Sequence, residues 1–364
     1  MIGVEAFRDE SAVWLAANQR YAPRDYGAIL PPDLRDEGTA WQRRLFDAGF
    51  AGIHWPEEHG GRGLTAEHTA AWIEQCALVG VPPFINMVGV VLAGGSLLLF
   101  GTEEQKREHL RPIIRGERVW CQLFSEPGAG SDLAGLSTRA DRDGDEYVLT
   151  GQKVWCSNGR ISDWGICMAR TDPTSKPHRG ISFFFVDMHS PGIDVRPLRQ
   201  MTGGSEFDEV FLDSVRVPSA RLLGAENDGW NVGMATLTNE RGHIGASAIS
   251  LQRRLDAMAS MGGGDVDPVQ RDELARLIGR GRSYLALAQR QGPVASVAGS
   301  LMKLGVTELL FDAAMLRTSI GGADAMLVND ASAGALAAPG GRIAGGTTQV
   351  QKNIIGERIL GLPK

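Results

Sequence analysis

The feature that most constrains this fold is a change in hydrophobic period that occurs twice along the 364 residues. From Glu5 to about Gly116, apolar residues recur at helical spacing. From about residue 119 to 223 they form short β-branched or aromatic runs, and from Asn227 the helical spacing returns. The pattern predicts an α+β chain with an N-terminal helical domain at 1–118, a middle β domain at 119–224 and a C-terminal four-helix bundle at 225–364.

The central segment contains several short candidate strands. They include Tyr147–Thr150, Lys153–Cys156, Ile166–Ala169, Ile181–Val186 and Glu209–Leu212. Turn dipeptides such as Asp143-Gly144 and Asn158-Gly159 separate the runs. Because no helical segment lies between them, the pattern predicts an antiparallel sandwich or barrel.

The first helix after the β domain has a regular apolar stripe. Its positions alternate spacings of four and three residues: Trp230, Met234, Leu237, Arg241, Ile244, Ala248, Leu251, Leu255 and Met258. One position in this stripe is an arginine. Since an unpaired buried guanidinium costs several kcal/mol, we expect Arg241 to be paired or to contact a ligand.

Charge and composition exclude several classes of protein. The chain has 37 Lys and Arg against 43 Asp and Glu, and a formal net charge of −6 disfavours a protein that mainly binds nucleic acid. The apolar run Val88–Phe100 is too short to span a bilayer. The first residues lack the pattern of a secretory signal, and the four cysteines form no CxxC pair. These features predict a cytoplasmic protein with no membrane span, disulfide framework or metal site.

Two segments of the β domain carry the motifs from which a function can be argued. The loop Ser125–Asp132 (SEPGAGSD) could bring backbone close to a flat or phosphorylated ligand, but taken alone it is as consistent with an ordinary tight turn. It lacks the third glycine of a dinucleotide fingerprint, and the chain contains no GxxxxGK. Combined with Gly151–Gly159 (GQKVWCSNG), the segment LFSEPGAGSD resembles the acyl-CoA dehydrogenase family.

The resemblance extends to both ends of the chain. Trp55–Gly61 (WPEEHGG) is similar to the N-terminal loop of the family, and Gly346–Gln351 (GTTQVQ) with Ile355–Arg358 (IGER) is similar to its last helix. The motifs occur in the family's order over nearly the whole chain. The resemblance therefore implies the family's helical, β and helical arrangement, an FAD cofactor and dehydrogenation of an acyl-CoA substrate.

The resemblance assigns flavin contacts to the β domain. Phe124 and Ser125 would bind the pyrimidine edge of the flavin, Trp155 would cover the ring, and the Ser157 hydroxyl would reach N5. Donors at these positions make physical sense, because hydride arriving at N5 leaves negative charge that fixed dipoles stabilise. The alternative is that Trp155 is a core aromatic of the sheet and that the serines are turn residues.

Further contacts follow from the same resemblance. Ser131 matches a position near the thioester arm and the pyrophosphate, so it is a candidate for both cofactor and substrate binding. Thr347 and Gln349 match cofactor contacts at the start of the last helix, where free N–H groups favour anionic oxygen.

The catalytic base implied by the family is displaced in this chain. Many members carry a glutamate just before the Gly-Thr of the last-helix motif, but here Gly345 occupies that position. Members similar to the isovaleryl and long-chain types instead carry the base on the first bundle helix, directly before an arginine, which corresponds to Glu240-Arg241. An apolar pocket would raise the pKa of Glu240 into the range of a general base. Arg241 is then a candidate substrate contact. The alternative is that Glu240 is a solvated residue on the surface of an amphipathic helix.

One family motif is missing. Homotetrameric members usually carry Arg-x-x-Phe-Gly after the first bundle helix, where it holds the FAD diphosphate of a neighbour, but residues 258–267 read MASMGGGDVD. The resemblance thus suggests a heteromer such as α2β2 with a related subunit, acting on a bulky, branched or steroid-type acyl group. Electrons would pass to an electron-transfer flavoprotein. Two alternatives stay open: a flavin oxidase or monooxygenase on the same scaffold, and a non-catalytic subunit that completes a partner's active site.

Overall fold

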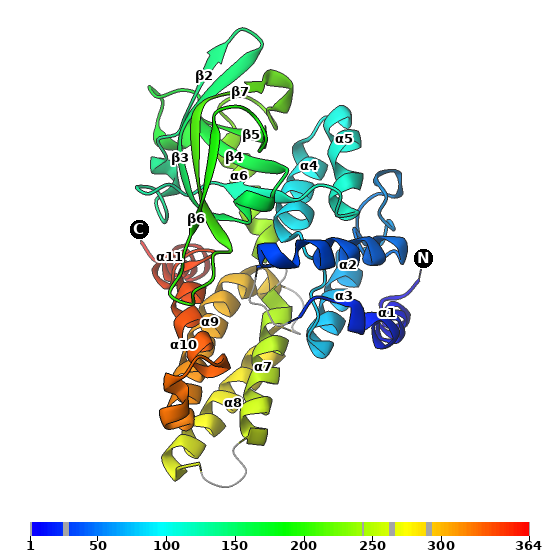
Figure 1. The fold of residues 1–364 in the computed structure, drawn as a ribbon, viewed down its shortest axis with the longest axis vertical. Helices are drawn as coiled ribbons and strands as arrows, with labels where there is room; N and C mark the ends of the chain where they lie inside the picture. Colours follow the sequence, from blue (N-terminus) through cyan, green and yellow to red (C-terminus); the bar gives the residue numbers. More distant parts are fainter. Residues whose placement is uncertain (1, 25–28, 242–243, 262–265, 289–292, 364) are drawn as a thin grey trace. The chain divides into compact units, whose positions relative to one another are not determined.

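A computed structural model describes residues 2–24, 29–241, 244–261, 266–288 and 293–363, with backbone only for 238–241, 244–246, 261 and 293–298. The chain forms two compact units. The first contains residues 1–72 and 81–240, and the second contains residues 73–80 and 241–364. Figure 1 shows the helices and strands of both units.

The first unit begins with helices, which confirms the prediction for the start of the chain. They are α1 (Val4–Asn18), α2 (Arg35–Asp47), α3 (Ala66–Val79), α4 (Gly94–Phe100) and α5 (Glu103–Ile114). Thr102 caps α5, since its hydroxyl accepts a hydrogen bond of 3.3 Å from the Gln105 amide. Aromatic side chains pack where α1, α2 and α3 meet, and Phe50 stacks on Trp72 with ring centroids 4.4 Å apart.

A seven-stranded sheet lies where strands were predicted. Its strands are β1 (Trp120–Leu123), β2 (Arg139–Asp143), β3 (Glu146–Ser157), β4 (Trp164–Arg170), β5 (Ile181–Asp187), β6 (Ile193–Leu198) and β7 (Phe207–Pro218). Their order is β1-β4-β2-β3-β7-β6, and β5 pairs with β4. Leu149, Phe184 and Val215 are fully buried in its core.

The sheet is mixed, whereas the sequence predicted an antiparallel one. β1 pairs with β4 in parallel, with Trp120 opposite Trp164, and the start of β2 pairs with the end of β4 in the same sense. The other pairings are antiparallel. A parallel pair needs a long crossover, which is usually a helix. Here the loop after β1 and the β2–β3 hairpin form that crossover, so the lack of a helical segment did not exclude a parallel pair.

The later positions of the predicted apolar stripe, Ala248, Leu251, Leu255 and Met258, are buried on α7 (Ile244–Met261), as predicted. The helix α6 (Gly229–Arg241) instead packs through small residues. Val232 and Thr236 are fully buried, and Thr236 Oγ1 lies 2.6 Å from Ser96 Oγ of α4. A Cβ on Gly229 would lie only 2.4 Å from the carbonyl carbon of Ser182 in β5. Only small side chains allow α6 to approach the sheet this closely, so the face with Gly229, Val232 and Thr236 is the buried one. The larger side chains of the stripe remain half-buried: Trp230, Met234 and Leu237.

The second unit is helical, as predicted. It contains α7 (Ile244–Met261), α8 (Pro268–Ala288), α9 (Pro293–Gly321), α10 (Asp330–Ile343) and α11 (Thr348–Ile354), which a π-helical turn continues to Ile359. Leu251, Leu277 and Leu309 are buried where α7, α8 and α9 meet, and α10 and α11 pack on α9. The end of α3 joins this unit, where the Ala77 carbonyl accepts a hydrogen bond from Arg253. Among the described helices of both units, none has the length and apolar character needed to cross a bilayer.

Candidate functional site

The loop that follows β1 is tied directly to β3. The Ser125 carbonyl accepts a hydrogen bond of 2.9 Å from the amide of Val154, and Glu126 and Ala129 exchange two backbone hydrogen bonds of 3.0 Å across Pro127-Gly128. Proline and glycine favour such a turn because proline presets φ and glycine tolerates close approach. The structure therefore places Phe124 and Ser125 beside the segment that contains Trp155. The Phe124 side chain is buried against Phe183.

A β-bulge turns Trp155 outward. Lys153 pairs with Val210 and Cys156 pairs with Asp208, so two residues of β3 oppose a single residue of β7. Trp155 has a φ of +60°, a conformation that is unfavourable for a bulky residue, and the residue is 59% exposed. The alternative interpretation of Trp155 as a core aromatic is therefore wrong. A strained backbone that exposes a large aromatic ring is typical of a binding site.

Ser157 ends β3 and precedes a turn that hydrogen bonds between Arg160 and Asp208 fix in place. Asn158 adopts a left-handed conformation, with a φ of +58°, and its buried side-chain oxygen has no partner within the described residues. Arg160 binds the buried carboxylate of Asp208 at 2.6 Å. Burial raises the pKa of Asp208, although the hydrogen bonds and charge of Arg160 act against this shift. Sequence reasoning missed this pair, because only the Asn158-Gly159 turn is visible as a pattern.

The hydroxyls of the three predicted serines could each bind a ligand. In the part of the chain that the structure describes, the side chains of Ser125, Ser131 and Ser157 make no hydrogen bond. Ser125 and Ser157 are half-buried, and Ser131 is exposed farther along the loop. The bonds between the loop and β3 bring Ser125, Trp155 and Ser157 together in one region of the sheet.

The predicted residues of the last helix lie in the second unit. Thr347 caps α11, and its hydroxyl accepts a hydrogen bond of 3.2 Å from the Val350 amide. Thr347 and Gln349 line a hollow of about 260 Å³ together with residues of α10, among them Arg342. The Arg342 guanidinium is paired with Glu308 at 2.8 Å. The Thr347 hydroxyl therefore already has an internal role as a helix cap.

Glu240 and Arg241 are the last two residues of α6. Their side chains lie outside the described residues, so the predictions made for the base and for Arg241 stay predictions.

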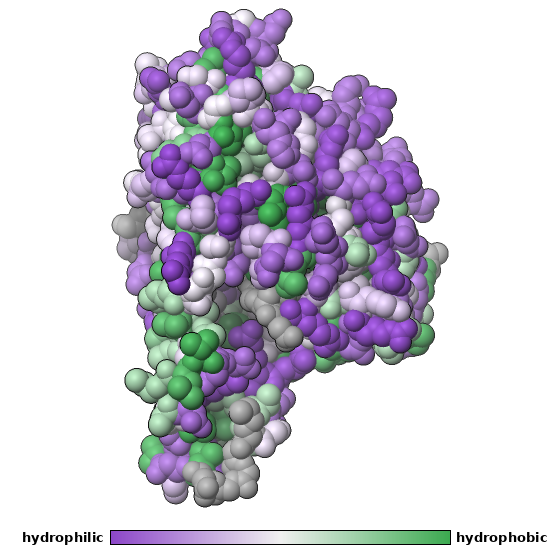
Figure 2. Space-filling view, viewed as in Figure 1, coloured by the Kyte–Doolittle hydropathy of each residue, from purple (hydrophilic) through white to green (hydrophobic). Residues whose placement is uncertain are grey.

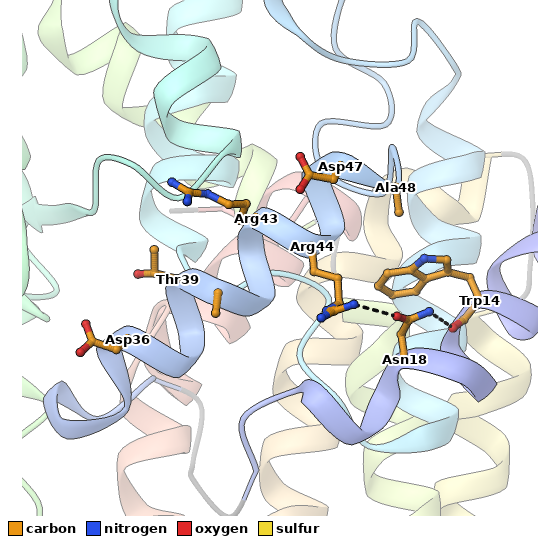
Figure 3. Close-up of a pocket in the computed structure, with 9 residues that line it drawn as sticks. Trp14, Asn18, Asp36, Thr39, Arg43, Arg44, Asp47 and Ala48 are labelled. Carbon is orange, nitrogen blue, oxygen red and sulfur yellow. Dashed lines mark hydrogen bonds between the residues drawn. The ribbon is translucent and has the colours of Figure 1, made fainter.

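A larger hollow, of about 650 Å³, lies in the first unit between α1 and α2. In Figure 3 its walls carry Asp36, Asp47, Arg43 and Arg44, and Arg44 binds the side chain of Asn18. The charges of its acids and bases balance, and none of the residues singled out from the sequence lines it.

Comparisons with known proteins define the class to which this fold belongs. Three family models match in chain order: the acyl-CoA dehydrogenase N-terminal domain at residues 25–117, the middle domain at 121–215 and the C-terminal domain at 273–360. The solved structure titled "Tcur3481-Tcur3483 steroid ACAD" aligns over 99% of this chain and 98% of that chain, with a TM-score of 0.84 and 26% identity. The ChsE4-ChsE5 complex from Mycobacterium tuberculosis aligns over 99% and 98%, with a TM-score of 0.81 and 28% identity.

A curated relative settles the family. Acyl-CoA dehydrogenase IpdE1 of Mycobacterium tuberculosis is 38% identical, over 100% of this chain and 99% of the relative. The chain belongs to the acyl-CoA dehydrogenase family, and it is an oxidoreductase of that family. The resemblance inferred from the motifs is thereby confirmed.

Proposed function

We propose that this protein catalyses FAD-dependent α,β-dehydrogenation of an acyl-CoA thioester with a bulky, branched or steroid-type acyl group, and that an electron-transfer flavoprotein accepts the electrons. The observation that carries the proposal is the exposed Trp155 on its strained bulge, beside the available hydroxyls of Ser125 and Ser157. Family membership supplies the reaction class.

The residues of the β domain fit a flavin. A flat ring needs an exposed aromatic face and nearby donors, and Trp155, Ser125 and Ser157 provide these without rearrangement of the core. When bound, FAD would supply the acceptor for the hydride that leaves the substrate. Thr347 and Gln349 would hold the cofactor from α11, and Ser131 would lie near the pyrophosphate and the thioester arm.

The remaining roles belong to the end of α6. The carboxylate of Glu240 takes the proton from the α-carbon of the thioester, while the β-carbon loses hydride and a double bond forms between the two carbons. Arg241 would contact the substrate. Gly345 occupies the position where many family members have the base, and the absence of a side chain there supports a bulky acyl group.

Assembly with a related subunit as α2β2 is supported by the surface of the second unit. Every residue of α10 is at least partly exposed, and the surface over α10 in Figure 2 is mostly apolar. The exposed fractions of Met326, Val328 and Ile343 are 88%, 104% and 65%. Apolar surface of this kind is typical of a protein interface. The titles of the two solved structures name pairs of proteins, which is consistent with a heteromer.

We also propose a cytoplasmic location. It is supported by the four cysteines, each of which is a buried free thiol.

The experiment that tests the function is co-expression with the related subunit, followed by measurement of FAD content and of flavin bleaching on anaerobic addition of acyl-CoA thioesters. We expect FAD to bind, and bleaching to be faster with steroid-type or branched acyl-CoA than with straight short chains. Rapid reoxidation of the reduced flavin by dioxygen alone would favour an oxidase instead. An assembly that binds FAD but is bleached by none of the thioesters would contradict the proposal.

A substitution at the bulge separates binding from stability. Trp155→Gly relieves a positive φ and removes an exposed ring, so we expect the free energy of unfolding to stay constant or rise by up to about 1 kcal/mol. Loss of aromatic stacking should weaken FAD binding roughly 10- to 100-fold. Thermal unfolding of the FAD-free protein and fluorescence titration with FAD measure the two effects. A fall in stability without weaker FAD binding would show that Trp155 is only structural.

A further inference from the structure

A buried ion pair joins the loop Ser125–Asp132 to β3. Lys153 Nζ lies 2.8 Å from Glu126 Oε1, and the two residues are 0% and 5% exposed. Such a pair is weak evidence for stability, because apolar residues of similar volume often replace buried ion pairs without loss. Lysine is also among the residues that are least often fully buried. Its presence in a sheet core therefore needs a reason other than stability.

The hydrogen bonds of Lys153 join three segments of the first unit. The ammonium donates to the carbonyl oxygens of Phe124 at 3.2 Å and Met168 at 2.7 Å, in addition to Glu126. All three of its donors are thus used. Through them, β3 is connected to the end of β1 and to β4.

Glu126 completes the network on the other side. Its carboxylate accepts hydrogen bonds from the Ser137 amide and hydroxyl at 2.6 and 2.7 Å, and from the Thr138 amide at 2.9 Å. Burial would raise the pKa of Glu126, but the Lys153 charge and these hydrogen bonds lower it to about 2. The carboxylate is therefore ionised at neutral pH, and the segment between β1 and β2 is anchored to one charged centre at Phe124 and again at Ser137 and Thr138.

The pair is directly connected to both sides of the candidate flavin site. On one side Lys153 holds the carbonyl of Phe124, the residue before Ser125. On the other side Lys153 is the last paired residue before the bulge that exposes Trp155, and its neighbour Val154 binds the Ser125 carbonyl. A shift of the ammonium would move the Phe124–Ser125 backbone and the bulge together.

We propose that Lys153 and Glu126 are a positioning pair, which sets the Phe124–Ser125 backbone against the Trp155 bulge at the geometry that FAD requires. This inference rests on the proposed function. Both side chains are buried, so the pair would act through Phe124, Ser125 and the bulge and not by contact of its own.

The test uses the co-expressed assembly with Lys153→Met, which keeps the length and apolar stem of lysine and removes its three donors. We expect FAD binding to weaken roughly 10- to 100-fold, as for the loss of hydrogen bonds to a charged group, with a changed visible spectrum of the bound flavin. Leu149→Ala is the matched control, because it also lowers stability in the core of β3 but makes none of these hydrogen bonds. It should leave the FAD dissociation constant and spectrum unchanged.

A double variant tests the same proposal if Lys153→Met does not fold. Lys153→Met with Glu126→Gln leaves no unpaired charge, and the one side-chain oxygen of Gln can still accept from the Ser137 amide and hydroxyl, although the bond from the Thr138 amide is lost. The double variant should therefore fold more readily than Lys153→Met alone, yet still bind FAD weakly. Wild-type FAD affinity and spectrum in either variant would overturn the positioning role. Failure of the wild-type assembly to bind FAD would instead contradict the proposed function, and this inference with it.

Discussion

Replacement of Glu240 by Gln is expected to lower the rate of flavin reduction by about 10²- to 10⁴-fold, the usual contribution of a general base. The amide keeps the size of the side chain but cannot take the α-proton. FAD content should stay at the wild-type level, because Glu240 is assigned no cofactor contact. Anaerobic stopped-flow measurement of flavin bleaching with saturating acyl-CoA gives the rate directly.

The control for this variant is Glu273→Gln, which changes an exposed glutamate on α8 and should leave the rate unaltered. Exchange of the α-hydrogen with solvent deuterium, measured on a thioester analogue that cannot lose hydride, isolates the proton transfer. Wild-type protein should catalyse this exchange and Glu240→Gln should not. A variant that still reduces its flavin at the wild-type rate would exclude Glu240 as the base.

The second large effect is expected at Gly229, where α6 meets β5. An added Cβ would lie 2.4 Å from the Ser182 carbonyl carbon and 2.7 Å from the Phe183 amide nitrogen, which are backbone atoms that cannot move aside. Gly229→Ala should therefore lower the free energy of unfolding by about 1–3 kcal/mol or more. Because α6 carries Glu240, flavin reduction should also slow in the fraction that folds.

Gly279→Ala provides the opposite control. A Cβ on Gly279, in the interior of α8, meets nothing within 4 Å. Removing a glycine from an exposed helix should raise the free energy of unfolding by about 0.5–1 kcal/mol. Urea denaturation of the two variants measures both changes. Equal effects of the two substitutions would mean that the close packing of α6 on the sheet is absent in solution.

The order of the elements and the family could be predicted from the sequence because their signals are local. Thr347 begins the last helix as predicted, and Thr102 begins α5 in the same way, since a capping hydroxyl acts within one turn. The motif residues are contiguous, so LFSEPGAGSD and GQKVWCSNG could be recognised without a fold. Hydrophobic period likewise distinguishes helix from strand within a short window.

The features that sequence reasoning missed depend on contacts between distant segments. The parallel pairing of β1 with β4 joins residues about 44 positions apart, and no local pattern encodes it. The stripe of α6 was misassigned because steric fit to the sheet favoured Gly229, Val232 and Thr236 over larger apolar residues. Lys153 looked like an ordinary strand residue, since only its burial beside Glu126 reveals the pair.

For this protein, the sequence by itself determined the helical, β and helical order, the helix starts and the acyl-CoA dehydrogenase motifs, because each depends on neighbouring residues. The tertiary structure alone decided which face of α6 is buried, that a bulge turns Trp155 outward, and that Lys153 and Glu126 join the loop to the sheet. The physical reason is that steric fit and the pairing of buried charge are properties of segments brought together by folding.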